Sequence, residues 1–298
     1  SIMRKDESMA NDMLSRISQM MPDFSKGQKL IGRFILDHYD KAAFMTASKL
    51  GKTVGVSEST VVRFASEIGF DGYPQLQRSL QEMIRNRLTA VQRMEITSEQ
   101  IGPSDLLSKV LNLDIEKIKR TLEETDINSF NQAVESILGA KRIYIIGIRS
   151  ASALAGFLSY YFSQIFEDVR YINTSSTSEA FEQMRTIGRE DVLIGITFPR
   201  YSKRAVSAAR FAKDSGAKVV AITDSISSPI AAYSDSLLLA RSDMASFVDS
   251  LVAPLSLINA LIVAIGLKRQ DEITKIYSEL EQIWDEYDVY EKAKERGR

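Results

Sequence analysis

The chain has 298 residues, of which 44% are hydrophobic and 26% charged, and this composition is ordinary for a globular protein of about two domains. It contains no cysteine, which excludes a disulfide framework, a thiolate nucleophile and a thiolate metal site. The net charge of −1 does not by itself indicate nucleic acid, and no apolar run approaches the length of a membrane span. The start of the chain also lacks the apolar core of a signal peptide, so we expect a cytoplasmic protein.

The first 88 residues are expected to form a helical domain. Apolar residues recur at helical spacing from Met13 to Ile35, and Ser25 followed by Gln28 is typical of a capping box. The segment 71–74 predicts a turn, with a further helix running to about residue 88. Between Ser25 and Arg63 there are seven basic and three acidic residues, a local charge of +4 that a phosphate backbone would attract.

The stretch 47–64 predicts a helix-turn-helix. Two helices that cross closely need a turn residue with positive φ and a small side chain four residues earlier, and Gly55 and Gly51 occupy these positions. Ser57 is placed to cap the second helix. The side chains expected on its outer face, where they would meet the major groove, are Ser57, Ser59, Thr60 and Arg63. The alternative interpretation is a helical hairpin with no role in DNA binding.

Residues 89–110 contain scattered Ser, Thr, Gly and Pro, which predicts a linker. Helices are expected at about 111–124 and 129–138. Short β-branched apolar runs then alternate with helical segments, the runs lying at 142–147, 169–172, 192–197, 218–223 and 236–239. The helical segments between and after them are expected at 153–165, 178–187, 203–215, 228–233 and 247–267. This alternation is typical of a doubly wound parallel sheet.

The predicted fold is therefore an all-α helix-turn-helix domain followed by an α/β domain over residues 111–270. A charged helix is expected at 271–298, with an apolar stripe and Trp284 that suggest packing on the body or on another subunit.

Two strand-to-helix loops of the second domain carry residues suited to an anion. One loop offers Arg149, Ser150 and Ser152, and the other offers Thr197, Arg200 and Ser202. Both follow parallel strands, and open α/β sheets bind ligands at the carboxyl ends of their strands. A helix N-terminus adds free backbone N–H groups and a positive dipole end. The alternative is that these hydroxyls are plain helix caps.

The segments 53–57, 60–64 and 68–73 resemble the N-terminal domain of RpiR/MurR-type regulators. The resemblance covers about residues 10–90 and implies that Ser57, Ser59, Thr60 and Arg63 lie on a recognition helix. It also implies phosphate contacts from the next helix, by Tyr73 and Gln75. The second domain resembles the sugar isomerase (SIS) domain over about residues 110–268. It departs from that pattern where Arg149 replaces a glycine and where Pro199 and Arg200 replace the central pair of the second loop.

The resemblance implies a bacterial transcription regulator whose SIS domain binds a phosphorylated sugar and thereby modulates binding to a double-stranded DNA operator. A homodimer or homotetramer is expected, without cofactor, metal or membrane. The first alternative is a phosphosugar isomerase with an accessory helical domain. However, the only histidine, His38, lies in the other domain, and Glu179 and Glu182 are expected on a solvated helix face. The second alternative is a structural dimerisation module.

Overall fold

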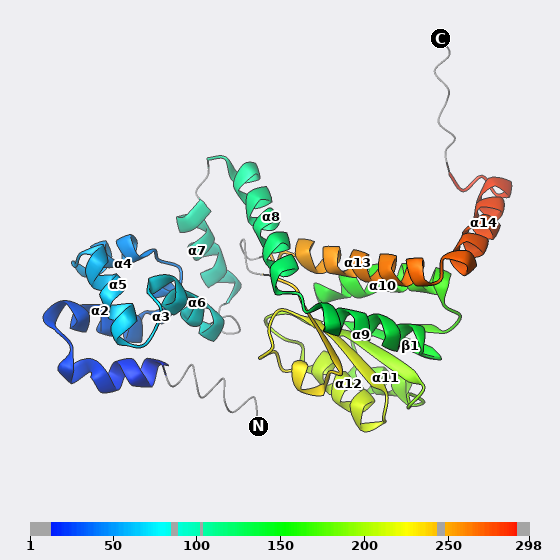
Figure 1. Cartoon of the computed structure of the whole chain (residues 1–298), viewed down its shortest axis with the longest axis horizontal. Coiled ribbons are helices and arrows are strands. Elements are labelled where there is room, and N and C mark those ends of the chain that lie inside the picture. Colours follow the sequence, from blue (N-terminus) through cyan, green and yellow to red (C-terminus); the bar gives the residue numbers. More distant parts are fainter. Residues whose placement is uncertain (1–12, 85–88, 102–103, 243–247, 291–298) are drawn as a thin grey trace, which may run out of the picture.

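The computed structural model describes residues 13–84, 89–101, 104–242 and 248–290. An all-helical part comes first in the chain and an α/β part second, and Figure 1 shows the two at opposite ends of the long axis. The sheet of the second part is parallel, with helices on both faces. The fold class predicted from the sequence is therefore confirmed.

The helical part begins with helical residues 13–20 and continues with η1 (Met21–Asp23), α2 (Lys26–Asp37), α3 (Tyr39–Ala42), α4 (Ala47–Val54), α5 (Glu58–Glu67) and α6 (Tyr73–Ile84). The predicted capping box opens α2, because the Ser25 hydroxyl accepts from the Gln28 amide and the Gln28 side chain accepts from the Ser25 amide. Fully buried side chains such as Ile31 and Phe64 form one core for these helices. The expected extension to residue 88 falls outside the described residues.

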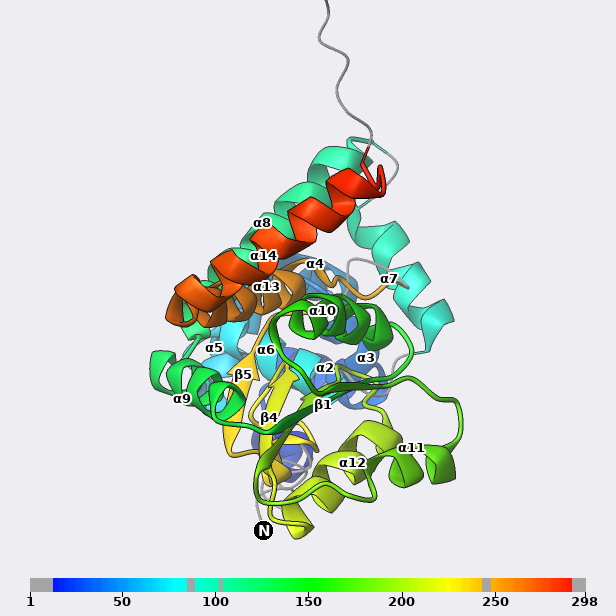
Figure 2. The same cartoon turned by 90° about the vertical axis from the view of Figure 1, so that its right-hand side faces the viewer.

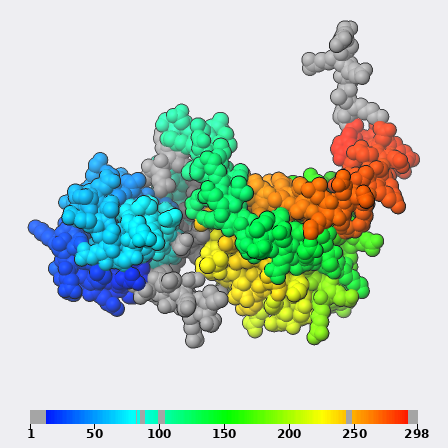
Figure 3. Space-filling view, viewed as in Figure 1, coloured from blue at the N-terminus to red at the C-terminus, as the bar shows by residue number. Residues whose placement is uncertain are grey.

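The segment predicted as a linker is largely helical. It contains α7 (Ala90–Ile101), and α8 (Leu106–Glu124) begins five residues earlier than the sequence predicted. Figure 1 shows α7 between the helical part and α8, and Figure 3 shows α8 rising beside the body of the second part. The scattered Ser, Thr and Gly residues made a helix less expected in this segment. α7 is nevertheless stabilised on both sides, because Ile96 packs against the core of the helical part and Arg93 forms an ion pair with Asp249 of the second part.

The second part contains the helix α9 (Ile127–Leu138) and five strands in the order β2-β1-β3-β4-β5, all parallel. The strands are β1 (Arg142–Gly147), β2 (Val169–Ile172), β3 (Asp191–Ile196), β4 (Lys218–Thr223) and β5 (Ser236–Leu239). The helices that follow strands are α10 (Ala151–Ile165), α11 (Thr177–Met184), α12 (Lys203–Asp214) and α13 (Val252–Lys268). The helix expected near 228–233 is only the 3-10 turn η2 (Ala231–Tyr233).

Two apolar layers sandwich the sheet. On one face, residues of α9, α10 and α13 pack against alternate strand residues such as Ile145 and Ile194. On the other face, α11 and α12 pack against Tyr144 and Leu193. Figure 2, which looks along the molecule, shows the two helix layers on opposite sides of the strands. Burial on both faces explains why the strands are apolar without alternation.

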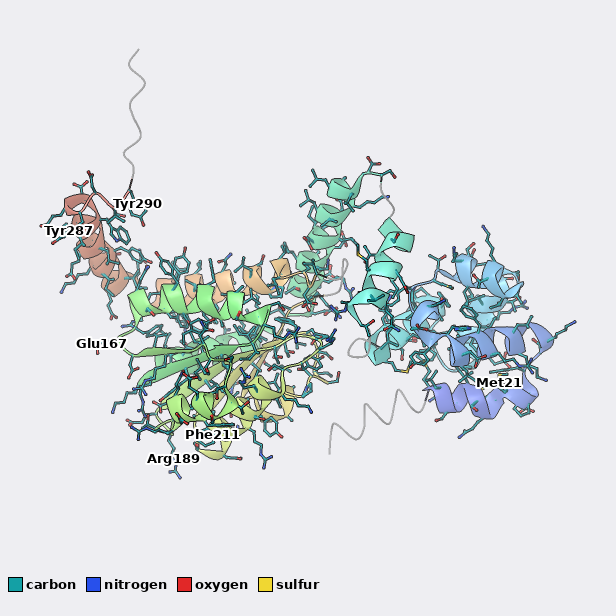
Figure 4. All side chains as sticks on the ribbon, turned by 180° about the vertical axis from the view of Figure 1, so that it is seen from behind. Met21, Glu167, Arg189, Phe211, Tyr287 and Tyr290 are labelled. Atoms are coloured by element: carbon teal, nitrogen blue, oxygen red, sulfur yellow. The ribbon has the colours of Figure 1, made fainter. Side chains whose placement is uncertain are left out.

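The described part of the last helix is α14 (Gln270–Glu286), which ends earlier than expected. It contacts the body near α10, where the Tyr277 hydroxyl donates to the Gln164 side chain at 2.7 Å. Figure 4 shows Tyr287 and Tyr290 at its outer end, away from the sheet. No single helix within the described ranges is long and apolar enough to cross a membrane, and α13 and α14 meet that test only as a pair bent by 101°.

Candidate functional site

The turn between α4 and α5 has the geometry that the sequence predicted. Gly55 lies at φ 80°, in the left-handed region that favours glycine. A Cβ added at Gly51 would lie 2.8 Å from the Val56 carbonyl oxygen, so no larger side chain fits without movement. Leu50 and Phe64 are fully buried between the helices. The second helix is therefore fixed at one angle to the first.

The outer face of α5 presents the polar side chains predicted to read DNA. The Ser57 hydroxyl accepts from the Thr60 amide at 3.3 Å, so Ser57 caps the helix. Ser59 and Arg63 are exposed, and Arg63 Nε donates to the Ser59 carbonyl at 3.4 Å. The Thr60 hydroxyl is 2.8 Å from that of Ser57. Ser57, Ser59 and Thr60 thus lie at the start of α5, and Arg63 lies one turn further along the same helix.

Tyr73 does not have the role that the sequence suggested. Its side chain is 3% exposed, and its hydroxyl donates to the Met45 carbonyl at 2.7 Å. Burial raises the pKa of Tyr73 to about 12. Gln77 donates to the same carbonyl at 2.8 Å, so α6 fixes the loop that precedes α4. Because the Tyr73 hydroxyl faces the interior, the phosphate contact predicted for it is wrong.

Gln75 lies exposed in the first turn of α6, next to the helix-turn-helix. Its side-chain oxygen accepts from the Asp71 backbone amide. Its amide nitrogen remains a donor on an exposed side chain, which suits a phosphate oxygen. The phosphate contact predicted for Gln75 therefore remains a proposal.

The two predicted anion loops start side by side in the sheet. Gly147 of β1 pairs with Ile196 of β3, and the loops leave the sheet directly after these residues. The carboxyl edge of the sheet therefore brings 147–152 and 197–202 together, as expected for open α/β sheets.

The first loop leads into α10. Arg149 is exposed and holds a φ of 60°, the conformation that favours the glycine of the SIS pattern. Ser150 begins the helix without capping it, and its hydroxyl donates to Asp249 Oδ2 at 3.1 Å. The Ser152 hydroxyl donates to the Arg149 carbonyl. Helix capping therefore does not explain the Ser150 hydroxyl.

The second loop leads into α12. Thr197 is buried, and its hydroxyl oxygen accepts from the Ser202 amide at 3.1 Å. Ser202 caps α12 by accepting from the Ala205 amide, so the alternative of a plain helix cap holds for this residue. Each hydroxyl still carries a proton that it can donate. Arg200 is exposed beside them.

Several polar residues at this edge were missed by the sequence reasoning. Asp249 accepts from Ser150 and also pairs with Arg93 of α7 at 2.7 Å. Asp224 is buried at the end of β4 and accepts from the Tyr201 hydroxyl at 2.9 Å. Arg204 donates to backbone carbonyls of the loop after β2. A basic residue in the first turn of a helix is unusual and was a usable signal for Arg204, whereas nothing marked the pairing of Arg93 with Asp249.

Of the three residues considered for isomerase chemistry, only Glu179 lies at this edge, where its carboxylate accepts from the Thr174 hydroxyl in the loop after β2. His38 is exposed at the end of α2, with its ring 5.2 Å from that of Phe34. Glu179 and Glu182 are exposed on α11, as predicted. Among the residues that the structure describes, no three His, Asp or Glu side chains are placed to hold a metal ion.

Two protein-family models match the chain. The helix-turn-helix domain of the rpiR family matches residues 11–87, and the SIS domain matches residues 136–264. An uncharacterised HTH-type transcriptional regulator of Clostridium perfringens is 24% identical over 71% of this chain and 75% of its own length. The HTH-type transcriptional regulator HexR of Pseudomonas aeruginosa is 22% identical over 87% of this chain and 90% of its own length.

Solved structures share the fold. The sugar isomerase domain of an RpiR transcription factor from Sphaerobacter thermophilus is 24% identical, covers 60% of this chain and 99% of its own, and gives a TM-score of 0.57. The Vibrio vulnificus NanR protein, complexed with ManNAc-6P, is 22% identical, covers 92% of this chain and 98% of its own, and also gives 0.57. With both family models matched in this order, the chain belongs to the RpiR family of helix-turn-helix transcriptional regulators that carry a SIS domain.

Proposed function

We propose that this protein binds an operator in double-stranded DNA through α5 and changes that binding when a phosphorylated sugar occupies its SIS domain. The observation that carries the proposal is the fixed α4–α5 turn with Ser59, Thr60 and Arg63 on the outer face of α5. Its relatives are named as transcriptional regulators, so the protein is a regulator and not an isomerase.

On the DNA side, we assign base-edge contacts to Ser59, Thr60 and Arg63, and phosphate contacts to Ser57 and Gln75. A recognition helix reads bases mainly with residues of its N-terminal part; Ser57, Ser59 and Thr60 lie there, and Arg63 lies one turn further along α5. Arg63 can bind a guanine edge or a phosphate, whereas the hydroxyls can reach either. Lys49 and Lys52 on α4 are exposed nearby and add positive charge for the backbone.

On the effector side, we assign the phosphate group of the sugar to the two loops at the carboxyl edge. Arg149, Ser150 and Ser152 would surround it from β1, and Thr197, Arg200 and Ser202 from β3. NanR was solved with ManNAc-6P, which supports a phosphosugar as the class of effector here. Hydroxyl protons and the N-terminus of α10 supply the donors that a phosphate needs.

We also propose a cytoplasmic homodimer or homotetramer, because two recognition helices match a pseudo-palindromic operator. Helix α8 supports self-association, since it exposes large apolar side chains: Leu107 is 74% exposed and Leu122 is 78% exposed. Exposed apolar surface of this kind marks interaction sites. The sequence suggested instead that the last helix packs on the body or on another subunit. Sedimentation velocity of Leu107→Lys and of Tyr287→Lys distinguishes an interface on α8 from one at the last helix.

The experiment that tests the effector class is thermal unfolding of the full chain with a panel of phosphorylated sugars that includes ManNAc-6P. A ligand at one hundred times its Kd stabilises the native state by about 2.7 kcal/mol, which corresponds to a midpoint shift of roughly 5–10 °C for a domain of this size. We expect Ser150→Ala to reduce the shift. Ser215→Ala, which removes a hydroxyl at the C-terminal end of α12, at the opposite edge of the sheet from the two loops, is the matched control.

The same compounds are then added to an operator fragment that the protein has selected from random duplexes. A compound that shifts the midpoint should also change operator affinity. If no phosphosugar shifts the midpoint, the effector class is wrong. If a phosphosugar is turned over to an isomer, the regulator assignment is wrong.

A further inference from the structure

Three segments that are distant in sequence meet at one carboxylate beside the start of α10. Arg93 of α7 pairs with Asp249 Oδ1 at 2.7 Å, and the Ser150 hydroxyl donates to Asp249 Oδ2 at 3.1 Å. Asp249 lies in the chain before α13. Both oxygens of the carboxylate are therefore engaged, one by the connector helix and one by the first anion loop.

Arg93 is only 5% exposed, yet one N–H group of its guanidinium has no hydrogen-bond partner. Its Nε is buried without a hydrogen-bond partner. A buried donor without a partner is uncommon because it loses its hydration and gains nothing in exchange. A guanidinium also presents a planar fork that matches the oxygens of a phosphate. Arg93 is thus a buried cation with a vacant donor next to the predicted effector loop.

The Asp249 carboxylate lies where a bound anion would be expected, at the N-terminus of α10. Ser150 begins α10, a 15-residue helix at the carboxyl end of β1, and the N-terminus of such a helix attracts negative charge. A second anion at Ser150 would face the carboxylate within a few ångströms, where two like charges repel strongly. A phosphate and Asp249 therefore compete for the same donors.

We propose that Asp249 is a built-in competitor that occupies the anion site, and that the phosphate of the effector displaces it and takes Ser150 and Arg93 as ligands. This inference rests on the proposed function, since it concerns the regulation of the same site. It makes Arg93, which lies outside the SIS domain match, a residue of the effector site. No covalent step is involved.

Displacement of Asp249 by phosphate would affect the helical part through α7. On α7, Arg93 holds Asp249, whereas Ile96 packs against the core of the helical part. When Arg93 leaves Asp249 for the phosphate, α7 loses its ion pair with the chain before α13. Ser250 stays bonded to Asp114 of α8 at 2.6 Å, so the neighbouring residue remains fixed while α7 moves. Figure 1 shows α7 lying between the two parts.

The test is isothermal titration of the full-length protein with inorganic phosphate at one fixed ionic strength, because salt screens such interactions. Asp249→Asn removes the competing charge and keeps the shape, so we expect its Kd for phosphate to fall at least about tenfold below that of the unsubstituted protein. Arg93→Met added to Asp249→Asn should abolish this gain. Asp214→Asn makes the same change in net charge at an exposed carboxylate on α12 and should leave the Kd unchanged.

A second measurement distinguishes a change at the anion site from misfolding of a variant. Hydrogen exchange of the α7 amides should rise when phosphate is added to the unsubstituted protein, and should be raised without phosphate in Asp249→Asn. If Arg93→Met does not fold, Arg93→Lys keeps the charge without the fork and should retain only part of the gain.

Equal phosphate affinity in the unsubstituted protein and Asp249→Asn would overturn the proposal, as would a tenfold gain that persists without Arg93. Failure of the proposed function would give a different result from failure of this proposal. In that case phosphate still binds Asp249→Asn more tightly, supporting the competition, but no phosphosugar changes operator binding in any variant.

Discussion

The sharpest consequence of the helical part is that Tyr73 stabilises the fold and does not contact DNA. Tyr73→Phe removes a hydroxyl whose oxygen lies 2.7 Å from the Met45 carbonyl, while the ring keeps its buried place. The carbonyl retains Gln77 as a donor at 2.8 Å, so it is not left without a partner. We therefore expect a loss of about 1 kcal/mol, the usual net contribution of one hydrogen bond. For a helical domain of this size the unfolding midpoint then falls by roughly 4–8 °C.

The double variant Tyr73→Phe/Gln77→Leu removes both donors. It should lose more than the sum of the single variants by about 1 kcal/mol, because the carbonyl is then orphaned. Calorimetry gives the midpoints, and titration of an operator fragment at 25 °C gives the affinity, which we expect to stay within about twofold for Tyr73→Phe. An unchanged midpoint together with a tenfold loss of operator affinity would refute the reasoning, since the hydroxyl would then act at the DNA.

Four further predictions concern the same two parts. Arg63→Ala should cost about 1–3 kcal/mol of operator binding with an unchanged unfolding midpoint, as measured by fluorescence anisotropy; a matching loss of stability would indicate a folding defect instead. Gly51→Ala should lower the midpoint of the helical part, because its Cβ meets the Val56 carbonyl at 2.8 Å; an unchanged midpoint would contradict the close crossing. Asp191→Ala, which leaves Arg142 without its bidentate partner at the amino edge of the sheet, should cost about 1–3 kcal/mol in denaturant unfolding, since Arg142 keeps Thr186 as a partner, but leave phosphate binding by the folded protein unchanged. Finally, the pKa of Tyr73 of about 12 exceeds its unfolded value of 10.0, so its contribution to stability is complete below pH 10 and lost as the pH rises toward 12. Tyr73→Phe should flatten this decline, and identical alkaline curves for the two proteins would contradict the burial.

Much of the architecture was predictable because it depends on local patterns. Continuous apolar runs such as 142–147 indicated strands buried on both faces, and the parallel sheet followed from their alternation with helices. Gly51, Gly55 and Ser57 marked the helix-turn-helix through requirements of the backbone within a few residues. The end of the sheet at which both predicted anion loops lie was also predictable, since parallel strands all end at one edge.

Tertiary structure decided what those residues touch. Tyr73 looks like a surface phosphate contact in sequence, but its hydroxyl meets Met45, 28 residues away, across a core that spacing does not reveal. Arg93 and Asp249 are 156 residues apart, and only the folding of α7 against the chain before α13 places them at Ser150. Periodicity in a sequence reports which side of an element is buried. It does not report which distant residue lies opposite, because that depends on how whole elements pack.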